Sequence, residues 1–292
     1  MKSFVLLFVF LIGVQLSYAQ KIDKKLTKQI GKIIQGFNGD IGIYVKSLKT
    51  GKIVAINADS VFPTASMVKV PILLGVIDKI NKGELTYHQP VIYKDSLLYA
   101  GVDILGSYKN NEQVELSKVI MLMLTTSDNT ASLWLQSLAG TGTRINEILQ
   151  ELGYKNTRVN SRTAGREENR ATYGWGQTTP FEMANIIERI YRKQIFNDSS
   201  CIRMMRLLGR NYWDEEGLSA IPPTVEVFSK NGAVNASRSE VMLVNAPHHP
   251  YVFCIITKNN KDQSWNANNE AWTLTRRLSS LLWSYFEPNM KF

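Results

Sequence analysis

Ser66 and Lys69 are the first residues along the chain whose types and spacing could support catalysis. Side chains three residues apart share one face of a helix, so the Lys69 amine can reach the Ser66 hydroxyl. The residues at 70–77 are almost all apolar, which predicts that this helix is buried. Burial lowers the pKa of a lysine because the charged form loses its hydration, and a neutral amine can activate a serine as a nucleophile.

The place of Ser66 at a predicted helix start favours the same chemistry. Backbone N–H groups and the helix dipole at such a start stabilise negative charge, which is what an oxyanion needs. The pair alone is a weak signal, because a chain of 292 residues contains about one Ser-x-x-Lys by chance. Taken alone, a capping serine and a lysine that reaches solvent would be the simpler explanation.

Two later segments carry polar residues next to apolar elements. Ser127-Asp128-Asn129 separates two apolar helical runs, and its side chains could simply cap the second helix. Lys230-Asn231-Gly232 follows a β-rich run and could simply be an exposed turn at the end of a strand. Neither segment alone distinguishes a functional role from a structural one.

The elements that must position these residues follow a simple order. Helical periodicity over 22–37 precedes two β-rich runs, 41–45 and 53–56, which Lys49-Thr50-Gly51 joins in a predicted hairpin turn. The chain from 64 to 216 is mostly helical in pattern. It includes Thr179-Pro180-Phe181-Glu182, a capping box with proline at the first helical position. Three strands, at 225–229, 240–244 and 251–257, and a helix over 274–285 complete the order.

This order predicts one mixed α and β domain that both ends of the chain build together. Residues 20–65 and 217–292 would form this discontinuous sheet domain, and residues 66–216 would form an inserted helical domain. The chain shows no internal repeat and no low-complexity linker.

Together and in this order, the three polar segments resemble the S-x-x-K, S-D-N and K-T-G motifs of the penicillin-recognising serine enzymes. The resemblance is specifically to the class A β-lactamase-like family of serine hydrolases, and the separations between the motifs are similar to that family's. It covers essentially the whole mature chain. It implies the β-lactamase/transpeptidase-like α/β (α+β) fold, with an antiparallel five-stranded sheet flanked by N- and C-terminal helices and an inserted all-helical domain.

The resemblance also implies a role for each matching residue. Ser66 would be the acylated nucleophile, Lys69 its partner in proton transfer, and Ser127 the relay of the proton to the leaving nitrogen. Asn129 would hold the amide side chain of the substrate, and Lys230 would attract its carboxylate. The backbone N–H groups of Ala233 and Ser66 would form the oxyanion hole. Arg238 would lie near the substrate carboxylate. Asn231 and Gly232 are the other implied substrate-binding residues.

Two positions depart from the family's pattern. Asn231 stands where the family usually has threonine or serine. Its amide can donate a hydrogen bond as a hydroxyl does, but with a different geometry, so the substrate specificity stays open. Counting back from 178–180 puts Thr163 in the place of the glutamate that activates the deacylating water in class A enzymes. Glu167, with Glu168, is the candidate replacement if the loop takes another path. A charged loop exposed to solvent is the ordinary interpretation of this pair.

The first segment predicts export. Lys2 precedes an apolar run over 4–14, and Ser17-Tyr18-Ala19 has small residues at both ends of a cleavage signature. The run is too short for a transmembrane anchor, and no later stretch is long or apolar enough to span a bilayer. The sequence therefore predicts a signal peptide at 1–19, cleaved near Ala19, and a mature protein that is periplasmic or secreted.

Composition excludes several other classes of function. The formal net charge is +9, but the basic residues are spread without a recognition motif, so we expect no nucleic-acid partner. Three histidines and two cysteines offer too few ligands for a metal centre, and we expect no metal and no cofactor. Whether Cys201 and Cys254 form a disulfide stays open. We expect a monomer that binds a small β-lactam or a substrate similar to a peptidoglycan stem.

Three functions compete at this point. The first is a serine hydrolase of the class A β-lactamase type that acts through acyl-Ser66. The second is a D-alanyl-D-alanine peptidase-like enzyme or a slowly deacylating penicillin-binding protein, because loss of a general base commonly costs 10²- to 10⁴-fold in rate. The third is a non-catalytic envelope-binding protein on the same scaffold. The complete set of Ser66, Lys69, Ser127 and Lys230 argues against the third.

Overall fold

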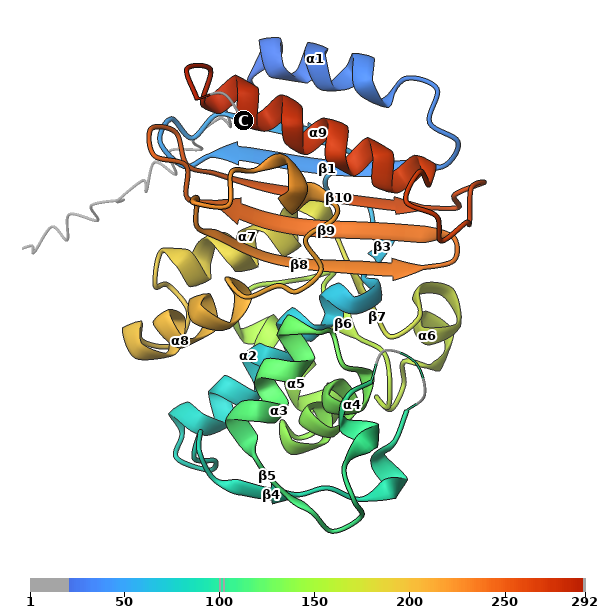
Figure 1. Ribbon diagram of the computed structural model, residues 1–292, viewed down its shortest axis with the longest axis vertical. Helices are drawn as coiled ribbons and strands as arrows, with labels where there is room; N and C mark the ends of the chain where they lie inside the picture. The colour runs from blue at the N-terminus through green and yellow to red at the C-terminus, as the bar shows by residue number, and fades with distance from the viewer. Residues whose placement is uncertain (1–20, 100, 102, 291–292) are drawn as a thin grey trace, which may run out of the picture.

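A computed structural model describes residues 21–99, 101 and 103–290, and the predicted signal peptide with its cleavage site near Ala19 lies outside the described residues. Its central element is an antiparallel sheet with the strand order β2-β1-β10-β9-β8 (Figure 1). The strands are β1 (Asp40–Ser47), β2 (Ile53–Ile56), β8 (Val227–Val234), β9 (Ser237–Val244) and β10 (Tyr251–Lys258). Segments from both ends of the chain therefore build one sheet, as the sequence predicts.

Two helices from opposite ends of the described chain, α1 (Lys24–Ile34) and α9 (Glu270–Phe286), cover one face of this sheet (Figure 1). Successive side chains of a strand point to opposite faces, so only alternate residues meet these helices. On β9, Met242 packs in one apolar cluster with Leu278 of α9, whereas Val241 belongs to the cluster on the other face. The sheet is therefore buried on both faces.

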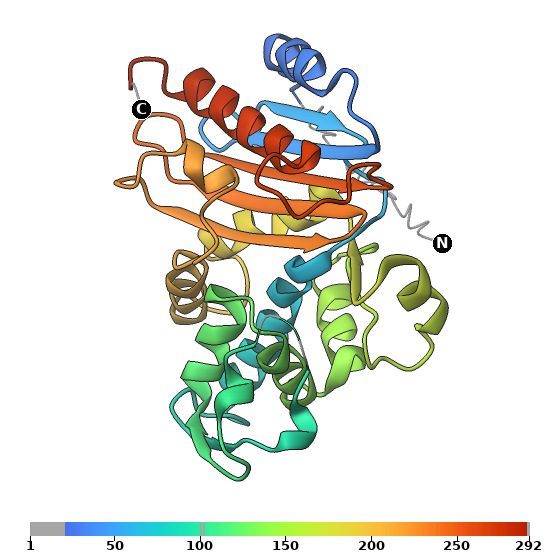
Figure 2. The ribbon, with the colours of Figure 1, turned by 45° about the vertical axis from the view of Figure 1, so that its right-hand side comes forward.

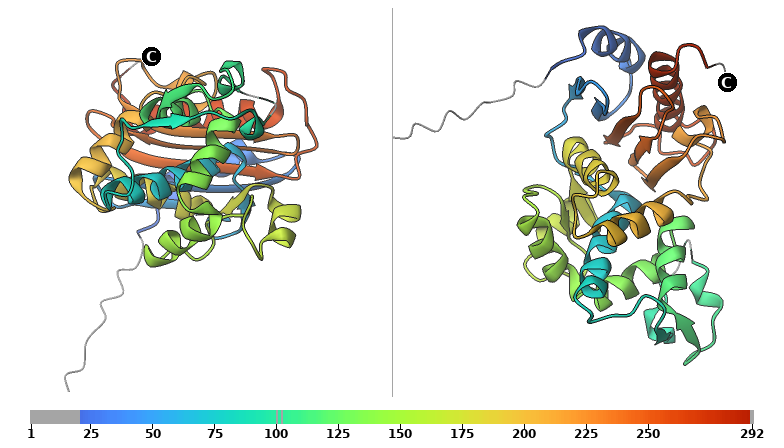
Figure 3. Two further views of the ribbon diagram at one scale, coloured as in Figure 1. Left: turned by 90° about the horizontal axis from the view of Figure 1, so that it is seen from below. Right: turned by 90° about the vertical axis from the view of Figure 1, so that its left-hand side faces the viewer.

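The other face of the sheet lies against α7 (Pro180–Tyr191), and the remaining helices lie on this side (Figures 2 and 3). These helices are α2 (Lys69–Asn81), α3 (Leu116–Thr125), α4 (Asn129–Leu138), α5 (Thr141–Glu151), α6 (Glu167–Tyr173) and α8 (Asp198–Leu208). Short strands connect them: β3 (Phe62–Pro63), β6 (Arg158–Val159) and β7 (Gly176–Thr178) form one small sheet, and β4 (Pro90–Ile92) pairs with β5 (Gln113–Glu115).

The expected fold class, with its five-stranded antiparallel sheet between N- and C-terminal helices, is confirmed. β8 and β9 extend beyond their predicted bounds, and β9 begins at Ser237 and not at residue 240. β8 continues past residue 229 and pairs with β9 throughout, so Lys230-Asn231-Gly232 lies within the strand. The ladder with β9 satisfies the backbone of this segment. The prediction ended β8 at residue 229 because the residues that follow are polar. A buried polar site and an exposed turn cannot be told apart by this sequence pattern.

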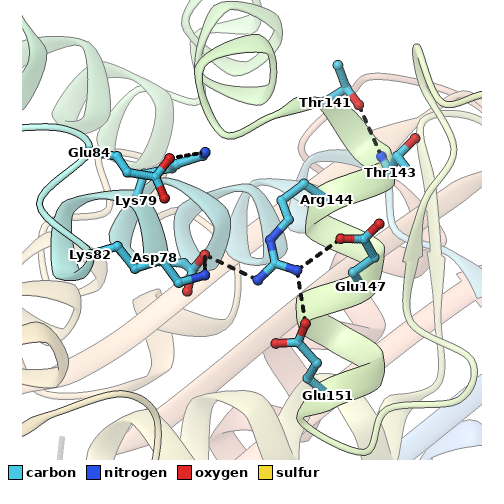
Figure 4. Close-up of polar contacts among 9 residues, drawn as sticks. All are labelled: Asp78, Lys79, Lys82, Glu84, Thr141, Thr143, Arg144, Glu147 and Glu151. Atoms are coloured by element: carbon cyan, nitrogen blue, oxygen red, sulfur yellow. Dashed lines mark hydrogen bonds and ion pairs between the residues drawn. The ribbon is translucent and has the colours of Figure 1, made fainter.

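α2 is held in place by close contacts with α5. A Cβ added to Gly75 of α2 would lie only 2.7 Å from Cγ1 of Ile145 on α5. Near the C-terminal end of α2, the Arg144 guanidinium of α5 donates to Glu151 of its own helix at 2.9 Å and to Asp78 of α2 at 3.5 Å (Figure 4). These contacts fix α2, and with it the turn at its N-terminus.

Glu182 of α7 closes the base of the long loop that leads from α5 to α7. Thr179 caps α7 by accepting a hydrogen bond from the Glu182 N–H at 3.1 Å, as the capping box predicts. The Glu182 carboxylate, however, accepts from the backbone N–H groups of Lys155, Asn156 and Thr157 and not from the cap residue. Only one of the two hydrogen bonds of the predicted capping box is therefore formed. The Glu182 carboxylate fixes the loop instead.

Separate replacement of Gly75 and Gly31 by alanine tests the packing of α2 on α5. Both glycines are inside helices, so each substitution gains about 1 kcal/mol of helix propensity. A Cβ at Gly31 meets nothing within 4 Å, and we expect Gly31→Ala to raise the free energy of unfolding by that gain. Overpacking at Gly75 costs about 1–3 kcal/mol, so Gly75→Ala should be less stable than Gly31→Ala by this amount. Urea denaturation measures both, and equal stabilisation would contradict the close packing.

Candidate active site

A cleft of about 580 Å³ lies between the β8 edge of the sheet and the helical part of the molecule. Ser66 lines it from the 3₁₀ turn Ala65–Val68 that precedes α2. Asn129 lines it from the first turn of α4, and Ala233 lines it from β8. The three polar segments of the sequence therefore meet at one place.

Lys69 connects Ser66, Ser127 and Asn129 through its Nζ atom, and its side chain is fully buried. Its Nζ lies 3.1 Å from Ser66 Oγ and 2.9 Å from Ser127 Oγ. The same atom lies 2.6 Å from the Ser127 carbonyl oxygen and 3.0 Å from Asn129 Oδ1. Burial lowers the pKa of Lys69 well below its ordinary value, and the charge of Lys230 lowers it further. The amine can therefore accept a proton.

The four oxygen atoms around Lys69 Nζ define where protons can move. A neutral amine has two N–H donors and one lone pair. The Ser127 carbonyl and Asn129 Oδ1 can only accept, so they take the two N–H groups. The lone pair is then available to the hydroxyls of Ser66 and Ser127, and each hydroxyl can donate. This arrangement can take the proton of Ser66 as its oxygen attacks and return a proton through Ser127.

Two residues of the site adopt left-handed backbone conformations, Ala65 with φ 44° and Ser127 with φ 63°. Such conformations are unfavourable for residues with a Cβ and persist where the surroundings enforce them, often at functional sites. Thr64, which precedes Ala65, is held from two sides. Its N–H donates to the Gly176 carbonyl at 2.9 Å, and its carbonyl accepts from Ser239 Oγ at 3.1 Å. The turn that presents the nucleophile is therefore fixed by the sheet and by β7.

Gly232 brings β8 against this turn. A Cβ on Gly232 would lie 2.7 Å from the Ser66 backbone nitrogen and 2.8 Å from the Thr64 carbonyl oxygen, so a larger residue would displace backbone atoms. The Ser66 N–H consequently lies beside β8, where the next residue, Ala233, lines the cleft. Two backbone N–H groups placed in this way can bind a developing oxyanion.

Lys230 and Asn231 form a unit on β8. The Lys230 ammonium is buried and donates to the Asn231 carbonyl oxygen at 2.9 Å and to Asn231 Oδ1 at 3.0 Å. Burial lowers the pKa of Lys230 to about 7, against a smaller effect of Glu240 that raises it. The lysine therefore loses its charge near neutral pH. Because the Asn231 oxygen binds the lysine, its NH₂ group is the part that can donate to a ligand.

Arg238, which the resemblance places near the substrate carboxylate, is not among the residues that line the cleft. The guanidinium carbon is 4.5 Å from the ring centroid of Trp265 and 4.6 Å from that of Trp272 on α9. Along β9, Arg238 alternates with Ser239 and therefore shares a face with Met242, which packs on the α9 side. The strand alternation thus puts its side chain on the face of the sheet that α9 covers, where it lines a small pocket together with Asn231.

The Arg238 guanidinium instead binds the turn between β8 and β9 from behind. Its Nη1 donates to the carbonyl groups of Val234, Asn235 (3.2 Å) and Ser237 (3.1 Å), and its Nη2 donates to the Ser264 carbonyl at 2.8 Å. The turn carries residues that line the cleft on its other side. Arg238 therefore supports the turn that forms part of the cleft wall.

The two candidate deacylating carboxylates lie outside the cleft. Glu167 and Glu168 are exposed in the first turn of α6, and Glu167 Oε1 accepts from the Gly165 N–H at 3.2 Å. Thr163 is buried and donates to the Ser161 carbonyl at 2.9 Å. The loop instead lines the cleft with residues 172–175. Over the described ranges, no aspartate or glutamate lines the cleft.

Several lining residues have no motif in the sequence. Tyr99 and Trp175 both line the cleft and meet edge to face with ring centroids 4.9 Å apart. Aromatic residues usually pack in cores, so their type gave no signal for a site. Lys258 and Asn259, at the end of β10, also line the cleft. Only the strand register, which places the end of β10 beside β9, could have located them.

The expectations for metals and cysteines can be compared directly with the structure. Across residues 21–290 apart from positions 100 and 102, no three His, Cys, Asp or Glu side chains form a group that could hold a metal ion. Cys201 on α8 and Cys254 on β10 are both buried free thiols. The pairing that the sequence leaves open is therefore absent between these two residues.

Comparison with known proteins places this site in a family context. The model of the beta-lactamase enzyme family matches residues 25–286. Over 293 residues the chain is 19% identical to the beta-lactamase VEB-1 of Pseudomonas aeruginosa, with 97% of each chain covered. Over 257 residues it is 21% identical to the extended-spectrum beta-lactamase PER-1 of the same organism, with 84% of this chain and 83% of PER-1 covered.

Solved structures share the fold. The structure of PBP-A superposes with a TM-score of 0.81 at 23% identity, over 92% of this chain and 98% of PBP-A. A class A beta-lactamase from Bacteroides cellulosilyticus superposes with a TM-score of 0.78 at 18% identity, over 91% of this chain and 98% of that chain. These likenesses show the β-lactamase/transpeptidase-like fold.

Replacement of Arg238 by methionine tests its support of the β8–β9 turn. The variant leaves the buried Ser237 carbonyl and three partly buried carbonyl groups without this donor and removes the cation that faces two indoles, so we expect the free energy of unfolding to fall by about 2 kcal/mol. Arg277→Met is the matched control, because Arg277 is exposed on α9, and it should change stability by less than about 0.5 kcal/mol. Chemical denaturation measures both, and equal effects would remove the supporting role.

Proposed function

Because the chain belongs to the beta-lactamase enzyme family, we propose that it is an exported serine hydrolase of the class A β-lactamase type. It opens β-lactam or related amide bonds through an acyl-Ser66 intermediate. The observation that carries the proposal is the buried amine of Lys69, whose pKa is lowered and whose Nζ contacts the hydroxyls of both Ser66 and Ser127. A capping serine and a solvent-reaching lysine would not be arranged in this way.

The proposed acylation follows from these contacts. Ser66 Oγ attacks the carbonyl carbon while Lys69 Nζ accepts its proton. The carbonyl oxygen becomes an oxyanion between the backbone N–H groups of Ser66 and Ala233. When the carbon–nitrogen bond breaks, Ser127 gives its proton to the leaving nitrogen and regains one from Lys69. Protons and charge balance, and the product is an ester on Ser66.

Substrate contacts in this proposal come from the two neighbouring segments. Lys230 attracts the carboxylate next to the leaving nitrogen, and the Asn231 NH₂ group donates to the same carboxylate. Asn129 lines the cleft and holds the amide of the acyl side chain. Gly232 permits this arrangement because its lack of a Cβ lets β8 approach Ser66. No nucleic acid or cofactor takes part.

A slowly deacylating penicillin-binding protein, with D-alanyl-D-alanine peptidase-like activity, is the second candidate. The specific observation that favours it is the position of Glu167 and Glu168, which are exposed on α6 while no acidic side chain among the described residues lines the cleft. Without a carboxylate to activate water, the acyl-enzyme would accumulate. The two candidates share acylation and differ only in the second step.

The proposed location is the periplasm or the exterior, as a monomer, after cleavage of the signal peptide near Ala19. The support is the apolar run over 4–14 with its small-residue cleavage signature. In the part of the chain that the structure describes, no helix has the length and apolar character needed to cross a membrane.

Intact-protein mass spectrometry with penicillin G tests the acyl-enzyme. A mutant of PBP-A, which is 24% identical to this chain, has been solved as an acyl-enzyme complex with penicillin G, so this compound is a reasonable first probe. We expect a mass increase equal to one penicillin that is absent in Ser66→Ala and unchanged in Ser280→Ala, since Ser280 is exposed on α9. Persistent labelling of Ser66→Ala would contradict the assignment of the nucleophile.

The lifetime of this adduct separates the two candidates. No described aspartate or glutamate lines the cleft, which predicts hydrolysis slower by about 10²- to 10⁴-fold than in an enzyme with a general base. We expect the adduct to remain after excess penicillin is removed, for minutes to hours. Clearance within seconds would show efficient turnover and exclude the slowly deacylating protein.

The pH dependence of acylation tests Lys230. Its pKa of about 7 means that it is cationic below this pH and neutral above it. The second-order acylation rate constant of penicillin G, divided by that of its methyl ester, should therefore fall as the pH rises through 7. The ratio cancels the contribution of Lys69, which both compounds require. In Lys230→Gln the ratio should be low and independent of pH, and a constant ratio in the unmodified protein would remove carboxylate recognition by Lys230.

A further inference from the structure

Lys258 is a second cation at the cleft, and the reaction described above does not use it. It lies at the end of β10 and lines the same cleft as Ser66. Its Nζ donates to the Val61 carbonyl at 3.0 Å and lies 4.8 Å from the ring centroid of Phe62. An ammonium has three N–H donors, so this anchoring leaves two for a ligand. The side chain is fixed but not saturated.

The charge of Lys258 is not neutralised by an ion pair with any described residue. Asp40 lies opposite Lys258 in the register of β1 and β10, but its carboxylate accepts from Asn259 Nδ2 at 2.7 Å. No acidic side chain lines the cleft within the described chain. A cation at a cleft wall without an acidic partner raises the local concentration of anions and favours an anionic ligand.

The register of the sheet places Lys258 on the opposite side of Ser66 from Lys230. Val234 of β8 pairs with Ser237 of β9, and the pairing of β9 with β10, continued to its end, sets Ser237 beside Lys258. These three residues form a row across the end of the sheet, and Lys230 lies four residues back along β8 on the same face.

Ser66 lies between the two lysines. A Cβ on Gly232, which is midway between Lys230 and Val234 on β8, would lie 2.7 Å from the Ser66 backbone nitrogen. Four residues along a strand and two strand spacings across give roughly 16 Å between the Cα atoms of Lys230 and Lys258. A ligand that reaches both cations must therefore extend past the reacting bond in both directions.

We propose that this cleft takes acyl donors with two carboxylates, one on each side of the bond that Ser66 attacks. Lys230 binds the carboxylate on the leaving-group side. Lys258 binds a carboxylate at the far end of the acyl side chain. The inference rests on the proposed function, because it names the substrate class of the same site. It makes Lys258 a specificity-determining residue and leaves the acylation chemistry to Ser66 and Lys69.

Two matched penicillins test this substrate class. The adipoyl and hexanoyl amides of 6-aminopenicillanic acid have acyl chains of equal length and differ by the terminal carboxylate. We expect the second-order acylation rate constant to be about fivefold higher for the adipoyl compound, as one partly exposed ion pair supplies. Competition with a coloured β-lactam measures both constants. Equal constants for the two compounds would overturn the proposal.

Three variants assign the preference to Lys258. In Lys258→Gln the preference should disappear while the constant for the hexanoyl compound stays within twofold. In Lys258→Arg it should persist, because the charge is kept. Lys261→Gln is the control for general charge, since Lys261 is exposed nearby, and it should leave the preference unchanged. A preference that survives Lys258→Gln would contradict the proposal.

A binding measurement separates failure of this inference from failure of the proposed function. If neither penicillin acylates the protein, the proposed function fails, and dissociation constants in the Ser66→Ala background still decide the inference. Calorimetry on Ser66→Ala should then show that the adipoyl compound binds about fivefold more tightly than the hexanoyl compound. This difference should disappear in the double variant Ser66→Ala Lys258→Gln. If the adipoyl compound had the same dissociation constant in Ser66→Ala and in the double variant, the role of Lys258 would be overturned even if acylation occurs.

Discussion

The structure depends above all on a buried lysine amine whose surroundings disfavour its charge. Lys69 Nζ has no access to water and is surrounded by four oxygen atoms from Ser66, Ser127 and Asn129. An ammonium at this place could donate to these atoms but could not accept the proton of Ser66. Burial in the apolar helix α2 and the nearby charge of Lys230 both disfavour the ammonium. The left-handed backbone at Ser127 completes the set by directing its carbonyl and its hydroxyl to the same nitrogen.

β8 serves the site from both of its faces, which is why its geometry is so constrained. On the cleft side, Gly232 lets the strand approach the Ser66 nitrogen. On the α9 side, Arg238 holds the turn after the strand and itself contacts two indoles that meet edge to face. An oxyanion hole needs its donors placed to within a few tenths of an ångström. Support from behind fixes the cleft wall without placing further charge in the cleft.

The sequence predicts the core of this site well and its periphery poorly, for physical reasons. Ser66 and Lys69 can be paired from helical spacing alone, and the three motifs together imply the fold. The direction of Arg238 requires the strand alternation of β9, which the sequence assigned only from residue 240 onward. Glu167 and Thr163 depend on the path of a loop whose course is set by the distant contact of Glu182 with residues 155–157. Lys258 reaches the cleft only through strand register, which no local pattern encodes.

Charge burial around β8 connects function with stability. The pKa of Lys230 is about 7 in the folded protein, below its ordinary value of 10.5. Between these two pH values the unfolded chain binds a proton that the native protein lacks. The free energy of unfolding therefore rises with pH over this range. Burial raises the pKa of Glu240, on the neighbouring strand, from 4.5 to about 7. Between pH 4.5 and 7 the native protein therefore holds a proton that the unfolded chain lacks. The free energy of unfolding falls as the pH rises over this range. The two contributions therefore reach their combined minimum near neutral pH. The ammonium that we propose to bind a carboxylate is thus buried at the expense of stability, which the apolar packing on both faces of the sheet offsets.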